Sequence, residues 1–410
     1  MTAVTRVDVL TFGCRLNIVE SEAMRQAAIA AGHRDLTVVN TCAVTAEAVR
    51  QSRQAVRRAG RHHPQGRLIV TGCAAEIDRA GFAALPGVDA VLPNAAKTAA
   101  ATWGRTGQDG GTEDMAGTPA SGGPAHTRGF VEIQNGCDHR CTFCVIPLGR
   151  GASRSAPPDE IVPRIRRLVD SGARDVVLTG VDITSYGTDC DPAASLGALV
   201  RRILRDVPDL PRLRLSSLDC IEADPVLLDA VASEPRLMPH LHVSLQSGSD
   251  LILKRMKRRH SRRDAIAFCA ELRRLRPDIV FGADLIAGFP TEDEGMFADT
   301  LDLIDACGLT HIHAFPYSPR PHTPAARMPQ VPPPVAHERA RLLREAGERR
   351  LDRHLGSLVG RELDILTERG GKGRAADFTP IRLPPGTPPG LLQPVRVTGH
   401  DGRCLVGPGA

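Results

Sequence analysis

Gln134-Asn-Gly-Cys137-Asp-His-Arg-Cys141-Thr-Phe-Cys144 brings three cysteines together in one short stretch, called here the compact set. Thiolates are soft ligands that select zinc, Cu(I) or iron–sulfur centres. A structural zinc needs a fourth ligand, and no second Cys-x2-Cys pair follows, although His139 lies inside the loop. Three thiolates on a 4Fe–4S cluster leave one iron free for a substrate or cofactor. The spacing therefore favours an open iron–sulfur cluster over zinc.

A second group of cysteines, the dispersed set, consists of Cys14, Cys42 and Cys73. It lies in a segment where strand-like and helix-like stretches alternate, which indicates an α/β domain of three layers. The strands are expected at 6–12, 35–40, 67–72 and 88–93, and the helices at 17–31 and 45–59. Each of the three cysteines directly follows an expected strand. Because parallel strands end at one edge of a sheet, we expect the dispersed set to gather there and hold a second cluster.

Beyond residue 103 the chain divides into three further segments. Residues 104–127 are rich in Gly, Thr, Ala and Pro and are typical of a linker. Residues 128–353 repeat a strand–helix unit about six times, which predicts a partial, open (β/α)6 barrel with its function on the loops after the strands. The strands are expected at 130–134, 175–180, 212–217, 240–245, 280–286 and 311–315, and the helices at 159–171, 195–206, 225–233, 261–275 and 293–307.

Residues 354–410 predict a small β-barrel without helix, with strands at 364–368, 378–383 and 393–398. Such a module often binds nucleic acid, and modules of this kind that serve stability or dimerisation are nearly as common.

Composition points to a cytoplasmic, metal-binding protein. The chain has 410 residues, a net charge of +5 and eleven cysteines, with no secretory segment and no apolar run of membrane-spanning length. Its basic residues are mostly arginine, which fits either a G+C-rich genome or phosphate contacts. Aromatic residues make up only 3%, so extensive base stacking on exposed rings is not expected.

The compact set, with Phe143 before its last cysteine, resembles that of radical S-adenosylmethionine enzymes, and the resemblance covers nearly the whole chain. In that superfamily the three cysteines hold a 4Fe–4S cluster that binds S-adenosylmethionine, and Phe143 would pack near the adenine. Three strand-ending loops agree with the assignment, although each alone is also typical of ordinary loops. The residues implied in cofactor binding are Phe143, Gly180 and Asp182, then Ser244, Gln246 and Ser247, then Asp284 and Gly288.

The three-part organisation is similar to that of the methylthiotransferases, whose last module is called TRAM. The amino-acid sequence most resembles the branch that acts on threonylcarbamoyladenosine in tRNA. The resemblance lies in the stretches 11–17, 40–48, 253–260 and 315–321. Sister branches act on isopentenyladenosine or on a ribosomal-protein aspartate, and a non-catalytic Fe–S RNA sensor is a more distant alternative. Two departures from the family pattern are His322, where glycine is usual, and Ala375-Ala376, where the TRAM loop is usually polar.

The resemblance implies two 4Fe–4S clusters, S-adenosylmethionine as cofactor and the anticodon stem-loop of tRNA as partner. An electron donor such as flavodoxin or ferredoxin would reduce the cluster on the compact set. The 5′-deoxyadenosyl radical would then remove hydrogen from C2 of the modified adenine at position 37. The dispersed set would hold the cluster that delivers a methylated sulfur, so a sulfur source is also implied. No catalytic residue is assigned beyond the cluster ligands.

Four arginines are candidates for RNA contact: Arg53 and Arg57 on an expected helix, and Arg258 and Arg259 in a basic run. For the helix pair a solvated face is an equally good interpretation. The five remaining cysteines lack partners at ligand spacing and are expected to be buried or inert: Cys190, Cys220, Cys269, Cys307 and Cys404.

Overall fold

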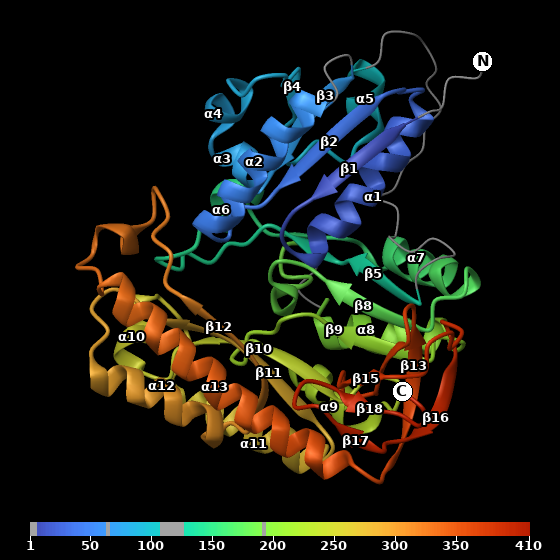
Figure 1. Ribbon diagram of the computed structural model, residues 1–410, viewed down its shortest axis with the longest axis vertical. Coiled ribbons are helices and arrows are strands. Elements are labelled where there is room, and N and C mark those ends of the chain that lie inside the picture. The colour runs from blue at the N-terminus through green and yellow to red at the C-terminus, as the bar shows by residue number, and fades with distance from the viewer. Residues whose placement is uncertain (1–5, 63–65, 107–126, 191–193) are drawn as a thin grey trace.

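Three parallel sheets, a mostly antiparallel C-terminal sheet and a short two-stranded antiparallel sheet organise the chain in the computed structural model, which describes residues 6–62, 66–106, 127–190 and 194–410 (Figure 1). The N-terminal part is a parallel sheet in the order β1-β2-β3-β4. Its strands are β1 (Val7–Thr11), β2 (Leu36–Thr41), β3 (Arg67–Gly72) and β4 (Ala90–Val91).

Both faces of this sheet are covered by helices, because β2 and β3 are apolar on both sides. Met24 and Trp103 pack on one face, from α1 (Arg15–Ala30) and α5 (Ala100–Thr106). Val56 and Phe82 pack on the other, from α2 (Ala46–His62) and α4 (Arg79–Ala83). The predicted three-layer α/β arrangement is confirmed. The short helix α3 (Cys73–Ile77) follows β3 directly.

Six parallel strands in chain order form the central open barrel. The first sheet contains β5 (Arg128–Glu132), β8 (Asp175–Thr179) and β9 (Arg212–Leu215); the second contains β10 (His240–Gln246), β11 (Val280–Ala287) and β12 (Leu309–Pro316). A parallel bridge between Leu218 and Val243 joins the two sheets. The predicted partial (β/α)6 barrel is therefore confirmed.

Helices cover the outside of the barrel, and most begin at a polar cap. The side chains of Ser195, Asp224, Ser261 and Asp293 each accept a backbone N–H at a helix start, which satisfies a donor that the helix itself cannot. The outer helices are α7 (Pro158–Asp170), α8 (Leu196–Asp206), α9 (Pro225–Ser233), α11 (Arg262–Leu275) and α12 (Glu294–Ala306). Shorter elements in the loops are β6 (Gln134–Asn135), α6 (Ile146–Arg150), β7 (Arg154–Ser155), η1 (Ile183–Ser185), α10 (Asp250–Arg255) and η2 (Pro324–Arg327).

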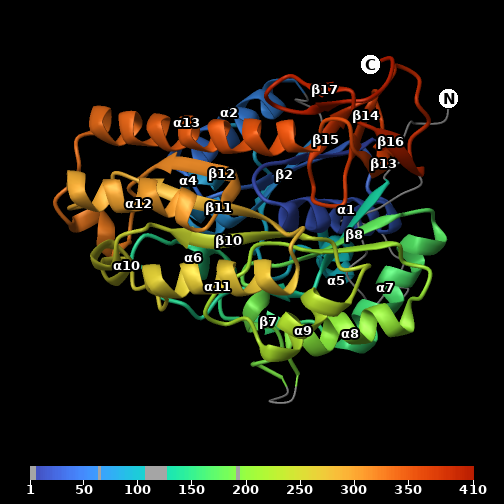
Figure 2. The ribbon, with the colours of Figure 1, turned by 90° about the horizontal axis from the view of Figure 1, so that it is seen from below.

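A long helix, α13 (Pro333–Leu358), lies along β12 and reaches the C-terminal sheet (Figure 2). Leu343 packs in the barrel core, whereas Leu355 and Leu358 pack in the core of the C-terminal sheet. The expectation that residues after 353 contain no helix is thus wrong at its start, because the last turn of α13 carries apolar side chains into the next core.

The C-terminal sheet is a curled, mostly antiparallel sheet in the order β16-β13-β14-β15-β18-β17. Its strands are β13 (Glu362–Glu368), β14 (Lys372–Arg374), β15 (Pro380–Arg382), β16 (Leu392–Arg396), β17 (Gly399–His400) and β18 (Leu405–Val406). This agrees with the predicted small β-barrel. The expected strand at 378–383 is shorter than predicted, because Phe378 has a left-handed backbone (φ 72°).

The loop between β14 and β15 is bound to the barrel by arginines from β9. Arg214 donates to the carbonyls of Ala376 (2.7 Å) and Ala375 (3.1 Å), and Arg212 donates to those of Asp364 (2.7 Å) and Arg374 (3.1 Å). The ring of Phe378 stacks on His240 of β10 at 5.0 Å between centroids. The two alanines that depart from the family pattern thus contribute backbone acceptors.

The second departure, His322, also has a conformational explanation. Its φ is 69°, the left-handed region in which glycine is favoured and other residues are uncommon. In the described part of the chain, no helix combines the length and apolarity required to cross a bilayer.

Candidate active site

The dispersed set gathers at the carboxyl edge of the N-terminal sheet, as predicted from the strand order. Cys14 precedes α1, Cys42 follows β2 and Cys73 begins α3. Burial, together with smaller contributions from the neighbouring thiols of Cys14 and Cys73, raises the pKa of Cys42 to about 11. Gly13 has a φ of 98°, and a Cβ there would lie 2.6 Å from the Cys42 sulfur. Glycine is therefore required for the loop that carries Cys14.

The compact set lies in the loop after β5 and β6, at the carboxyl end of the barrel. Burial raises the pKa of Cys137 to about 12 and that of Cys144 to about 11, and in each case other thiols of the set contribute. The backbone N–H of Cys137 donates to Gly151 (3.1 Å), which closes the loop. Arg258 approaches from the loop after α10, with Nη1 3.9 Å from the Cys141 sulfur.

The two cysteine sets face each other where α3 contacts α6. Cys73 is the first residue of α3, and α6 begins two residues after Cys144, so this helix contact brings the two sets together. Gly149 of α6 packs against Cys73, since a Cβ at this glycine would lie 3.1 Å from the Cys73 Cβ. Asn94 links both sides, because Nδ2 donates to the Gly149 carbonyl (2.5 Å) and lies 3.8 Å from the Cys73 sulfur.

A buried ion-pair network supports this contact. Arg150 of α6 donates to both Glu20 oxygens of α1 (2.8 and 3.0 Å) and to Asn17 Oδ1 (2.6 Å). Lys97 donates to Glu20 at 2.6 Å. Burial alone would raise the pKa of Glu20, but Lys97 and Arg150 lower it to about 2. Asn17 in turn donates to the carbonyls of Phe12 (2.6 Å) and Thr41 (3.2 Å), next to the loops of Cys14 and Cys42.

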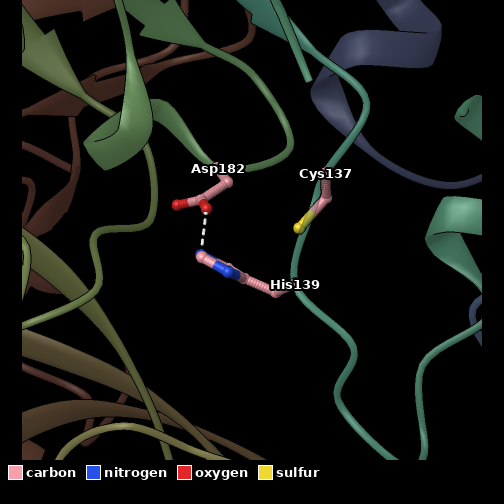
Figure 3. A group of neighbouring side chains, drawn as sticks. All are labelled: Cys137, His139 and Asp182. Atoms are coloured by element: carbon pink, nitrogen blue, oxygen red, sulfur yellow. Dashed lines mark ion pairs between the residues drawn. The ribbon is translucent and has the colours of Figure 1, made fainter. Parts of the chain in front are cut away.

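Beside the compact set, His139 points toward Asp182 of the loop after β8 (Figure 3). Its Nε2 lies 2.6 Å from Asp182 Oδ2 and 3.4 Å from Glu222 Oε2. Hydrogen bonds to these two carboxylates raise the pKa of His139 to about 10, so the imidazole is positively charged at neutral pH. Asp182, predicted to bind the cofactor, is thus held next to the cysteine loop.

Two other predicted cofactor residues also lie beside this loop. Phe143 packs edge-on against Phe289, with 6.4 Å between ring centroids. Gly180 ends β8, and a Cβ there would lie 2.6 Å from the Gln134 carbonyl oxygen. The Gln134 side chain accepts the N–H groups of Val181 (3.1 Å) and Asp182 (2.9 Å), which ties the two loops together.

The remaining predicted cofactor residues have contacts of their own within the barrel. The carbonyl of Ser244 accepts from Arg258 (2.7 Å), and Gln246 has a left-handed φ of 68° at an irregular point of β10. The hydroxyl of Ser247 is 3.1 Å from Thr300 of α12, and Gly288 (φ 69°) packs against α13.

Asp284 contacts two histidines of neighbouring strands. Its Oδ1 is 3.0 Å from His242 Nε2 and 3.3 Å from His313 Nδ1. Burial would raise the pKa of Asp284, but these hydrogen bonds lower it strongly.

Of the four arginines predicted to contact RNA, Arg57 is the one whose exposed guanidinium has no ion pair in the described ranges. Arg53 pairs with Asp78 and lies over the Phe82 ring at 4.6 Å. Arg258 is nearly buried and pairs with Asp219 (3.0 Å), and Arg259 pairs with Asp219 and Glu222.

Cysteines outside the two sets follow the expectation with one exception. Cys220, Cys269 and Cys307 are buried, and Cys404 is half-buried, 3.4 Å from Asp401. Cys190 is exposed, so for this residue burial does not hold and inertness stays a prediction.

Sequence reasoning missed the residues that surround the cysteines: Asn17, Glu20, Asn94, Lys97 and Arg150. A periodic pattern marks a buried face but does not show which polar residues meet across two domains. Of these residues, only Asn17 could have been noticed in the sequence, because it lies three positions after Cys14.

The donor sets fit iron–sulfur clusters. The compact set offers three thiols on one loop and the dispersed set three thiols on neighbouring loops. Burial makes the free thiolates of Cys42 and Cys137 costly, so a bound cation would stabilise them. In the described segments, every group of three or more metal-binding side chains outside the two sets includes a carboxylate, which suits harder cations than iron in such clusters.

Comparisons with known proteins agree with this geometry. Residues 131–304 match the Radical SAM superfamily, and residues 6–93 match Uncharacterized protein family UPF0004. Threonylcarbamoyladenosine tRNA methylthiotransferase MtaB of Rickettsia prowazekii is 43% identical over 92% of this chain and 91% of its own length. The tRNA-2-methylthio-N(6)-dimethylallyladenosine synthase of Sorangium cellulosum is 34% identical over 90% and 83%.

Among solved structures, the radical S-adenosylmethionine methyltransferase TsrM of Kitasatospora setae superimposes with a TM-score of 0.55 and 16% identity. The overlay covers 76% of this chain and 68% of that chain, and it bears on the fold alone. Sequence relatives of this closeness and coverage settle the family. The chain belongs to the radical S-adenosylmethionine methylthiotransferases that act on tRNA, on their MtaB-like branch.

Proposed function

We propose that this enzyme adds a methylthio group to C2 of N6-threonylcarbamoyladenosine at position 37 of tRNA. The observation that carries the proposal is that the two cysteine-bearing segments meet, because Gly149 of α6, the helix that follows Cys144, packs directly on Cys73. Sulfur delivery and hydrogen removal at one carbon require two reactive centres that face a common space. The substrate is inferred from relatives named for threonylcarbamoyladenosine, at 32–43% identity.

The compact and dispersed sets would each hold a 4Fe–4S cluster, and S-adenosylmethionine would bind over the compact set. When bound, these groups supply radical hydrogen removal and a sulfur donor, chemistry that amino-acid side chains lack. Phe143, Gly180 and Asp182 are the predicted cofactor residues that lie beside the cysteine loop. Ser244, Gln246, Ser247, Asp284 and Gly288 remain predictions.

The protein's own residues would orient and shield the two centres. Arg150 and Glu20 fix the contact between the sets, and His139 fixes the loop after β8 through Asp182. Arg258 brings a positive charge to Cys141, which favours a more reduced, more negative cluster. We further infer an electron donor such as flavodoxin or ferredoxin, a sulfur source, and a cytoplasmic location where tRNA is available. The proposed division at residues 103, 127 and 353 remains a working definition of the domains.

A second candidate substrate is dimethylallyladenosine, the isopentenyl type of modified base. Relatives named for it reach 32–34% identity over 90–99% of this chain. A ribosomal-protein aspartate has no such support among these relatives.

Nucleoside mass spectrometry of tRNA tests the proposal. Cells that lack the gene are compared with cells complemented by the wild type, by Cys14→Ala and by Cys190→Ala. We expect 2-methylthio-threonylcarbamoyladenosine to disappear without the gene and to return with the wild type and with Cys190→Ala, which alters an exposed cysteine outside both sets. Cys14→Ala should fail to restore it. Persistence of that nucleoside, with loss of the dimethylallyl product, would select the second substrate.

A further inference from the structure

A cluster of arginines surrounds the ring of Phe378 where three parts of the chain meet. The guanidinium carbons of Arg374, Arg128 and Arg15 lie 4.3, 5.4 and 5.8 Å from its centroid, and that of Arg214 lies at 5.2 Å. Arg15 begins α1, Arg128 begins β5 and Arg374 ends β14. Guanidinium groups favour aromatic faces, but four like charges around one ring repel each other.

Only part of this positive charge is balanced. Arg214 is buried and neutralised by Asp175 at 2.7 Å, so its role is structural. Arg128 and Arg374 share one carboxylate, Glu368, which lies 3.1 Å from Arg128 and 3.5 Å from Arg374, and Arg15 pairs with neither this nor another carboxylate of the described residues. Burial and then the charge of Arg128 lower the pKa of Arg374, which reflects this crowding.

Arg15 is the open member of the cluster. It is exposed, and within the parts of the chain that the structure describes its guanidinium has no hydrogen bond or ion pair. Besides Phe378, it lies 5.9 Å from the centroid of Phe130 on β5. An oxyanion at this point would meet an unpaired guanidinium, flanked by two aromatic rings and two further arginines. Arginine is the side chain best suited to a planar carboxylate or a phosphate.

We propose that Arg15, Arg128 and Arg374 form an oxyanion site that receives the carboxylate of the threonylcarbamoyl group. This inference rests on the proposed function. Arg15 follows Cys14 directly, so the site adjoins the dispersed set that must reach C2 of the same base. The threonylcarbamoyl group carries a planar ureido unit suited to the ring faces and a carboxylate at its end. A dimethylallyl group has no charge, so the arginines would discriminate between the two bases.

A backbone phosphate of the anticodon loop is the other tRNA source of such an oxyanion. The two sources are separated by measuring binding of the anaerobically reconstituted full chain to labelled anticodon stem-loops. One loop carries unmodified adenosine at position 37, one carries threonylcarbamoyladenosine, and one carries its methyl ester. All three have the same phosphates, and only the second has the free carboxylate.

For the wild type, we expect about tenfold tighter binding of the threonylcarbamoyl loop than of the other two. Arg15→Gln should abolish this preference and leave affinity for the unmodified loop unchanged. Arg374→Gln provides a second test in the same cluster. Arg382→Gln is the matched control, because this exposed arginine of the same sheet lies outside the cluster and pairs with Asp401. Iron content of Arg15→Gln checks that Cys14 still holds its cluster.

Three results would overturn the assignment. If Arg15→Gln and Arg374→Gln lower the affinity for all three loops equally, the arginines bind a backbone phosphate and not the carboxylate. If both variants still bind the threonylcarbamoyl loop more tightly than the other two loops, the arginines have no role in recognition. The proposed function would then still stand. A wild type that shows no such preference, and that methylthiolates a dimethylallyl loop instead, would refute the proposed function together with this site.

Discussion

At the scale of single residues, the pair of Arg150 and Glu20 is central to the site. Both side chains are almost fully buried, and each has further polar partners, so neither charge is isolated. A buried pair adds little net stability over apolar residues, but removal of one partner leaves the other charge poorly compensated. The pair therefore specifies which surfaces of α1 and α6 meet.

Arg150→Met is expected to lower the free energy of unfolding by about 3 kcal/mol, because Glu20 loses one of its two buried cationic partners and the Asn17 carbonyl oxygen loses its donor. Urea unfolding followed by circular dichroism measures this. Arg341→Met, which removes an exposed arginine paired with Glu338 and Glu345 on α13, should cause no measurable loss. Equal effects of the two substitutions would contradict the role given to the buried pair.

Glu132 provides a prediction on pH. Burial, and then the charge of Glu20, raise the pKa of Glu132 to about 7. A carboxyl group whose pKa is raised by folding binds its proton more tightly in the folded state, so stability is lost as pH rises from the unfolded value toward 7. Glu132→Gln cannot ionise. Between pH 6 and 8 the variant should gain about 1 kcal/mol of stability relative to the wild type. A constant difference across this range would show that Glu132 titrates normally.

At the scale of elements, the strands were predicted better than the contacts between them. Apolar runs such as those of β2 and β3 located the sheet and its ligand-bearing edge. The long helix α13 was missed, although Pro333 and Pro334 at its start and the spacing of Ala340, Leu343 and Gly347 are helical signals. The conformation of Phe378 was unpredictable, because its left-handed backbone is fixed by the packing of its ring between β10 and the arginines.

The turn between β1 and α1 supports a further prediction. Gly13→Ala would force a Cβ into contact with the Cys42 sulfur and strain a φ of 98°. If the dispersed set holds a cluster, bound iron should fall to about half while the compact set keeps its own. Iron per chain and the electron paramagnetic resonance of the reduced protein measure both. Gly104→Ala is the control, since a Cβ there meets no atom within 4 Å. Full iron content in Gly13→Ala would show that this turn can rearrange.

At the scale of the whole molecule, the three parts of the chain have hydrophobic cores of their own and are joined by polar contacts. The N-terminal sheet meets the barrel through Arg150, Glu20 and Asn94, and the C-terminal sheet meets it through Arg212 and Arg214. None of these contacts follows a periodic pattern, which explains why sequence analysis predicted the folds of the parts but not how they join.

Arg212→Ala should loosen the C-terminal sheet specifically. It removes hydrogen bonds to the carbonyls of Asp364 and Arg374, so amide hydrogen exchange in β13 to β15 should accelerate while that of β8 and β11 stays unchanged. Arg205→Ala, at an exposed position of α8, is the comparison. Acceleration throughout the barrel strands would mean that Arg212 supports the whole fold and not this one joint.

The helix α13 fixes the distance between two of these parts. At 26 residues it is about 39 Å long, and its two ends belong to different cores. A continuous helix resists bending, so it acts as a strut that sets the spacing between the barrel mouth and the C-terminal sheet. If the proposed function holds, an RNA that contacts both points has to span the distance that this helix fixes, so only a nucleotide at one position along the loop would reach the cysteines.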